Sequence, residues 1–154
     1  MAARVDFDVR HALDAPARAV WEELTDWAGH GRWVPATRVA VDAGSPTGVG
    51  ATFTAWTGLG PVALPDRMRV AACEWDDEAA RGWCEVVKEG PVLRGRAGFT
   101  VSTEGEGSTV EWYERVTVPG VPQLLAPLLA SCGAAVFRVG MRRLARRMPH
   151  RTDG

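Results

Sequence analysis

The chain has 154 residues, 46% of them hydrophobic, which is the size of one domain with a single core. Its formal net charge of -1 provides no general attraction to nucleic acid, so we expect no nucleic-acid partner. The N-terminal segment lacks the apolar run of a secretory signal, which favours a cytoplasmic protein.

The sequence contains no pattern that indicates a metal, a cofactor or a known catalytic motif. Cys73, Cys84 and Cys132 are far apart and odd in number, which argues against a disulfide framework or a zinc site. HExxH, GxSxG and a phosphate-binding glycine loop with lysine do not occur. We therefore expect neither metal nor cofactor.

The first 30 residues predict a strand followed by two short helices. Residues 5–13 alternate between apolar and polar, as in a half-buried strand. Pro16 then suits the first turn of a helix whose apolar residues fall on one side up to Leu24. A second short helix is predicted over 27–30, before Gly31.

From residue 37 the apolar period changes to two and stays so for roughly 80 residues. Short turn clusters separate the strands, which favours an antiparallel meander because parallel strands need long crossovers. The predicted strands are Arg38–Asp42, Ala51–Thr57, Asp66–Trp75, Gly82–Lys88, Leu93–Thr103 and Ser108–Val118.

The C-terminal part predicts a long helix over about 122–147. Residues 117–137 carry no charge, and residues 138–147 include five arginines. A membrane span needs about 20 strongly apolar residues, and three prolines here would leave backbone groups unpaired in lipid. We therefore expect a buried helix and no transmembrane segment. The arginines suit the helix dipole, with an anionic lipid or partner surface as the alternative.

The order of elements predicts an α+β fold. About seven antiparallel strands form one curved sheet, two short helices follow the first strand, and the C-terminal helix covers the apolar face. This order, with several local motifs, resembles the START-like superfamily, also called Bet v 1-like or SRPBCC, which includes polyketide cyclase/dehydrase and lipid-transport proteins. The motifs are Leu13-Asp14-Ala15-Pro16, Ala19-Val20-Trp21, Thr25-Asp26-Trp27, Trp33-Val34-Pro35, Gly48-Val49-Gly50 before Phe53, Asp66 to Val70, and Thr109 to Glu114.

The resemblance covers residues 4–148 of a single domain, 1–154. It implies a helix-grip fold with an internal cavity for apolar ligands, but it does not fix an activity. Strand alternation and the broad apolar face of the helix supply the side chains that would line the cavity. For strand 82–88 both faces fit the pattern, and we place Trp83 inward. The ligand-binding candidates are Trp33, Phe53, Met68, Trp83, Phe99, Trp112, Glu114, Leu128, Cys132 and Val136. A filled core with little cavity is the alternative.

Glu114 lies on the apolar face of its strand and is the first catalytic candidate. A buried carboxylate must be hydrogen-bonded, paired or neutral, and a raised pKa would suit it to acid–base work. A purely structural ion pair is the alternative. His11, on the first strand, is the second candidate, because the first and last strands are neighbours in this fold and the two side chains could meet.

These observations predict a protein that binds a small hydrophobic molecule, lipid-like or polyketide-like, between sheet and helix. The alternative is a polyketide aromatase/cyclase or dehydratase that uses the same cavity. A third hypothesis is a protein-interaction module. Nothing in the pattern indicates an oligomeric state.

Overall fold

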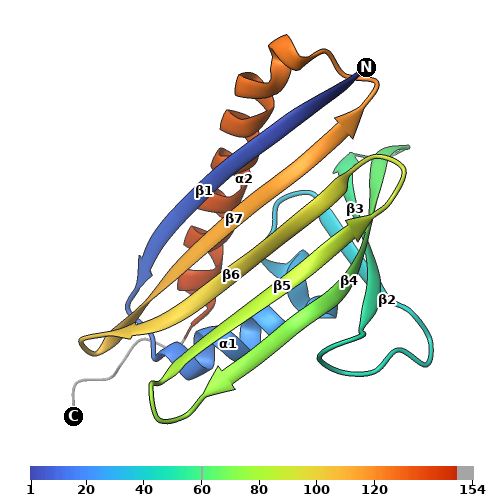
Figure 1. Cartoon of the computed structure of the whole chain (residues 1–154). Coiled ribbons are helices and arrows are strands. Elements are labelled where there is room, and N and C mark those ends of the chain that lie inside the picture. Colours follow the sequence, from blue (N-terminus) through green and yellow to red (C-terminus); the bar gives the residue numbers. More distant parts are fainter. Residues whose placement is uncertain (60, 149–154) are drawn as a thin grey trace.

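A computed structural model describes residues 1–59 and 61–148 of the chain. Seven strands form one antiparallel sheet in the order β1-β7-β6-β5-β4-β3-β2 (Figure 1). The elements are β1 (Ala2–Leu13), α1 (Ala17–Thr25), the 3-10 helix η1 (Trp27–Arg32), β2 (Thr37–Val41), β3 (Thr52–Leu59), β4 (Val62–Asp76), β5 (Arg81–Glu89), β6 (Arg94–Glu104), β7 (Gly107–Pro119), the 3-10 helix η2 (Gln123–Leu125) and α2 (Ala126–Arg147). The predicted α+β helix-grip architecture is confirmed.

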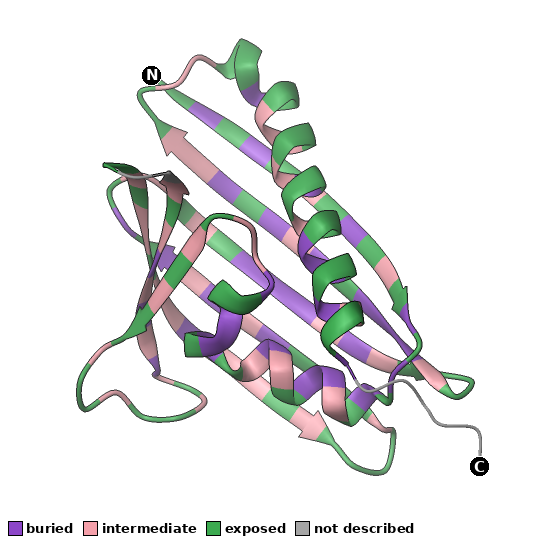
Figure 2. Cartoon of the chain, turned by 180° about the vertical axis from the view of Figure 1, so that it is seen from behind, coloured by how far each residue is buried: buried purple, intermediate pink, exposed green. Residues whose placement is uncertain are grey.

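The helices lie on one side of the curved sheet (Figure 2). The buried side chains of α1 are Ala17, Val20, Trp21 and Leu24. β1 and β7 pair along their whole length, from Ala2 opposite Pro119 to Leu13 opposite Ser108. The first and last strands are therefore neighbours, as predicted.

A register shift in β4 decides which side chains face the concave side of the sheet. The pairing of β4 with β5 slips between Val70 and Ala72. Beyond the slip Cys73 pairs with Cys84 and contacts the core. A bulge inserts one residue and reverses the alternation that follows, so Cys73 and not Ala72 shares the inner face with Val70.

Trp83 on β5 was predicted to face inward, and this was wrong. β5 buries Gly82, Cys84, Val86 and Lys88, whereas Trp83 is 45% exposed on the opposite face. A Cβ added at Gly82 would lie 2.5 Å from the Trp21 ring. The inner face there is already filled by α1, and only glycine fits beneath it.

α2 packs along β1, the edge strand of the sheet (Figure 2). Its buried residues are Ala126, Ala134, Gly140, Met141 and Leu144. A Cβ added at Gly133 would lie 2.6 Å from the Phe7 ring, so the helix approaches β1 closely at this point. Small residues thus set the depth at which α2 docks.

Leu128, Cys132 and Val136 were predicted to face the cavity, and this was wrong. All three are exposed, Leu128 to 61%. The prediction assumed that the broadest apolar face of the helix is the buried one. The small side chains on the other face permit closer packing against β1, and this turns the leucines toward solvent.

Candidate functional site

A cavity of about 100 Å³ lies between the concave face of the sheet, η1 and α2. Its wall is mostly apolar and aromatic, with a polar cluster in the same wall. The lining side chains that carry the argument are Trp27, Phe53, Met68, Phe99, Trp112 and Phe137 for the apolar part, and Asp66, Lys88 and Glu114 for the polar part.

Stacked rings form the apolar wall. Trp27 from η1 stacks on Phe53 of β3, with 4.8 Å between the ring centroids. Phe99 of β6 stacks on Trp112 of β7 at 5.3 Å, and Phe137 of α2 contacts Trp112 at 4.3 Å. Such contacts stabilise aromatic pairs beyond their burial, so the wall is built from rings that support one another.

Three ionisable side chains from three different strands meet in the cavity wall. The ammonium of Lys88 donates to Oδ2 of Asp66 at 2.6 Å and lies 3.3 Å from Oε2 of Glu114. Oε1 of Glu114 accepts a hydrogen bond from the indole N–H of Trp112 at 3.2 Å. One cation therefore serves a buried carboxylate, Glu114, and a partly buried one, Asp66.

Small residues on β6 make this cluster possible. β6 separates β5 from β7, and it places Gly95 opposite Lys88 and Ala97 opposite Glu114. No large side chain stands between the lysine and the glutamate, so the Lys88 stem reaches across the intervening strand. Asp66 approaches from β4, on the other side of Lys88.

The cluster holds unequal charges, and this shifts two pKa values. Burial raises the pKa of Glu114, Lys88 opposes that rise, and Asp66 adds to it. Burial alone would lower the pKa of Lys88, but Glu114 and Asp66 outweigh it and the pKa is raised. The lysine thus stays charged, and Glu114 takes up a proton more readily than an ordinary glutamate does.

Asp66 keeps one acceptor without a protein partner. Its Oδ1 atom is buried and accepts no hydrogen bond from the described residues. Buried polar atoms are nearly always satisfied, and this oxygen belongs to a side chain in the cavity wall. Asp66 therefore keeps a hydrogen-bonding capacity that the described residues do not use. The described residues include no group of three or more acidic, histidine or cysteine side chains placed to hold a metal ion.

His30 of η1 also lines the cavity. Its Nε2 atom lies 2.7 Å from the carbonyl oxygen of Leu24, which makes Nε2 the protonated nitrogen of the neutral ring. Burial lowers the pKa of His30 to about 4, against smaller opposing effects of that carbonyl and of Asp26. At neutral pH the ring is an uncharged part of the wall.

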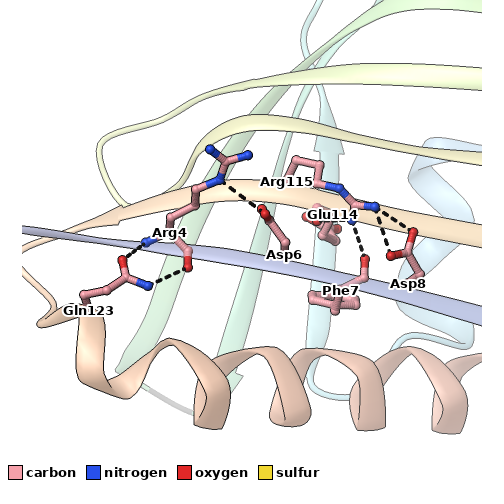
Figure 3. Close-up of polar contacts among 7 residues, drawn as sticks. All are labelled: Arg4, Asp6, Phe7, Asp8, Glu114, Arg115 and Gln123. Atoms are coloured by element: carbon pink, nitrogen blue, oxygen red, sulfur yellow. Dashed lines mark hydrogen bonds and ion pairs between the residues drawn. The ribbon is translucent and has the colours of Figure 1, made fainter.

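Contacts on the other face of the sheet fix the strand that carries Glu114. Arg115 donates to both carboxylate oxygens of Asp8 at 2.9 Å and to the carbonyl of Phe7 at 3.0 Å (Figure 3). Gln123 exchanges two hydrogen bonds with the backbone of Arg4 and ties the start of the C-terminal helical region to β1 (Figure 3). Both contacts hold β1 between β7 and α2.

The structure brings together half of the predicted binding residues. Phe53, Met68, Phe99, Trp112 and Glu114 line the cavity. Leu128, Cys132, Val136 and Trp83 do not, for the reasons given above.

Trp33 and His11 lie elsewhere. Trp33 is fully buried, but it packs between His30 and the backbone of Gly140 and does not line the cavity. His11 pairs with Val110, whereas Glu114 pairs with Phe7, four residues along the same strand. At about 3.3 Å per residue the two side chains do not meet, so the predicted His11–Glu114 pair was wrong. Burial and nearby Arg142 lower the pKa of His11.

Sequence reasoning missed Lys88 and Asp66 as site residues. A signal for Lys88 existed, because it is the only lysine of the chain and follows Cys84 and Val86 at a spacing of two. Once these two residues are placed inward, Lys88 is inward as well. Asp66 lies on β4 two residues before Met68, and no local sequence pattern distinguishes it from a solvent-exposed strand residue.

A curled antiparallel sheet gripping an apolar cavity beside a C-terminal helix defines a helix-grip protein. The sequence matches the family model "Polyketide cyclase / dehydrase and lipid transport" over residues 4–149. The chain therefore belongs to that family. No curated protein matches the chain.

Solved structures agree with this fold. Ginseng major latex-like protein 151 from Panax ginseng has a TM-score of 0.66 at 14% identity, covering 96% of this chain and 99% of its own. TTHA0849 from Thermus thermophilus has a TM-score of 0.71 at 17% identity, covering 92% and 95%. At such low identity these likenesses establish the fold and leave the ligand open.

Proposed function

We propose that this protein binds a small apolar molecule, with one aromatic ring and one hydroxyl or amine, in the cavity beside Trp112. The Oδ1 atom of Asp66 carries the proposal, since it is a buried acceptor without a partner among the described residues and belongs to a side chain in a mostly apolar wall. Pockets of this composition bind through apolar contact and are made specific by a few polar groups.

The size of the cavity limits an enclosed ligand to about one ring. A dry cavity of about 150 Å³ holds benzene, and this one measures about 100 Å³ without ligand. A longer lipid or polyketide chain would need Phe137 and α2 to move, or would extend past the opening. Of a longer ligand, only a part of about one ring would contact the cavity wall.

A pair of ligands of equal shape tests the polar contact. We expect p-cresol to bind about tenfold more tightly than p-xylene, because its hydroxyl can donate to Asp66. The indole N–H signals of Trp27 and Trp112, both in the wall, report binding in an NMR titration. Asp66→Asn is expected to remove most of the preference. Equal affinity of the two ligands for the unchanged protein would contradict the proposal.

A matched pair of variants tests the location. Ala55 lines the cavity from β3, whereas Ala40 on the neighbouring strand β2 is exposed. Ala55→Leu should abolish binding by filling the space, and Ala40→Leu should leave it unchanged. Loss of binding in both variants, or in neither, would place the ligand elsewhere.

A polyketide aromatase/cyclase or dehydratase is the second candidate, favoured by the raised pKa of Glu114 beside Lys88. The ionised Glu114 would take a proton from a carbon between two carbonyl groups. Lys88 would donate a hydrogen bond to the enolate oxygen, and the carbon would then attack a second ketone of the same chain, whose oxygen takes the proton back from Glu114. Loss of water from that product gives the ring double bond.

The test is cyclisation of a linear poly-β-ketone thioester, followed by mass spectrometry. Glu114→Gln should abolish any acceleration over the spontaneous reaction. Glu111→Gln, on the outer face of the same strand, is the control. If the unchanged protein gives no acceleration, or Glu114→Gln retains it, the enzyme candidate fails while ligand binding stands.

A further inference from the structure

The outward face of α2 is apolar over three turns. Leu128, Cys132, Val136 and Val139 form this surface, and Leu124 of the preceding helix η2, which is 82% exposed, continues it. At 1.5 Å per residue the stretch from Leu128 to Val139 is about 17 Å long. Monomeric proteins rarely leave so continuous an apolar face uncovered, and such faces mark interaction sites.

The same helix ends in positive charge and carries no acidic residue. Arginines 138, 142, 143, 146 and 147 all lie exposed on α2, and no Asp or Glu occurs between Glu114 and Asp153. None of the five makes an ion pair within the described part of the chain. The helix thus joins an apolar face to unpaired cations.

A membrane span and a helix-to-helix dimer both fit this surface less well. Region Gln123–Arg147 is long and apolar enough to cross a membrane, but it packs along β1 and its last two turns hold four of the arginines. Pairing of α2 with α2 of a second copy would bury the leucines, but it would bring arginines to a helix that offers no carboxylate. An anionic membrane surface accommodates both features, because its acyl-chain region can take up the apolar side chains and its headgroups can pair with the arginines.

We propose that α2 docks this protein on a membrane that contains anionic phospholipid, with the helix axis parallel to the bilayer plane. Leu124 and Leu128 would enter the boundary between headgroups and acyl chains, and the arginines would contact lipid phosphates. An apolar face combined with basic residues is the pattern of helices that lie in the membrane interface, and each basic residue near an anionic surface adds to the attraction.

Vesicle flotation with the full chain tests the proposal. We expect the protein to float with vesicles of 70% phosphatidylcholine and 30% phosphatidylglycerol, and to bind pure phosphatidylcholine at least tenfold more weakly. The double variant Arg146→Gln, Arg147→Gln should lose affinity for anionic vesicles by about fivefold per arginine. Leu128→Glu should lose binding without unfolding, because this side chain is exposed.

The controls are surface changes of the same kind elsewhere. Arg81→Gln and Trp83→Glu alter an exposed arginine and an exposed apolar residue of β5, and both should bind as the unchanged protein does. Equal binding to both vesicle types, or no binding to the vesicles that contain phosphatidylglycerol, would overturn the proposal. So would a dimer, seen by light scattering, that Leu128→Glu converts to monomer.

Discussion

Acidification should destabilise this protein through His30. The ring is buried against Leu24 and the wall of the cavity, and burial lowers its pKa from 6.5 to about 4. The folded state therefore binds this proton more weakly than the unfolded state. The contribution of the neutral ring is complete above pH 6.5 and is lost as the pH falls toward 4.

The magnitude follows from the shift. A difference of about 2.5 pKa units corresponds to about 3.4 kcal/mol at full protonation. Between pH 7.5 and pH 4.5 the expected loss in the free energy of unfolding is about 2.5 kcal/mol. This is a large part of the stability of an ordinary domain. Glu114 acts in the opposite direction, because its raised pKa lets the folded state take up a proton first.

Urea unfolding at a series of pH values measures the effect. His30→Gln keeps a side-chain donor for the Leu24 carbonyl and cannot be protonated, and Glu114 contributes equally to both proteins. The difference in stability between the unchanged protein and the variant should therefore shrink by about 2.5 kcal/mol from pH 7.5 to pH 4.5. Parallel pH profiles would refute the reasoning. His11→Gln, at a less buried histidine, should leave most of the slope in place.

Two further changes test the packing. Lys88→Met leaves the buried Glu114 and the partly buried Asp66 without their cation and should cost about 3 kcal/mol at pH 7. The cost should fall as the pH is lowered, because burial raises the pKa of Glu114 and lets it protonate; a cost independent of pH, measured by urea unfolding, would argue against the buried cluster. Gly133→Val drives a side chain into the ring of Phe7 and should cost about 1–3 kcal/mol, whereas Ala135→Val on the exposed face should stay within about 0.5 kcal/mol. Similar melting temperatures for the latter two variants would contradict the orientation of α2.

The candidate site was predicted in part. Glu114 was expected on the inner face because it stands between Trp112 and Val116 at a spacing of two, and the structure buries all three. Its partners could not be predicted in the same way. Lys88 and Asp66 lie 22 residues apart in the chain and come from different strands, so their meeting depends on sheet curvature and on the small residues of β6.

Sequence alone determined the order of the elements along the chain, the antiparallel pairing of successive strands and the inner face of β7, because alternation and short turns are local properties that sheet formation preserves. The pairing of β1 with β7 was expected only from the family resemblance. Tertiary structure decided the side on which α2 docks and the direction of Trp83. The apolar residues on one face of a helix or strand indicate how much free energy burial of that face would contribute. The face that is actually buried also depends on how closely the element can approach its neighbour. At Gly133 and Gly82 the absence of a side chain settled that distance, so the larger apolar residues beside them were turned outward.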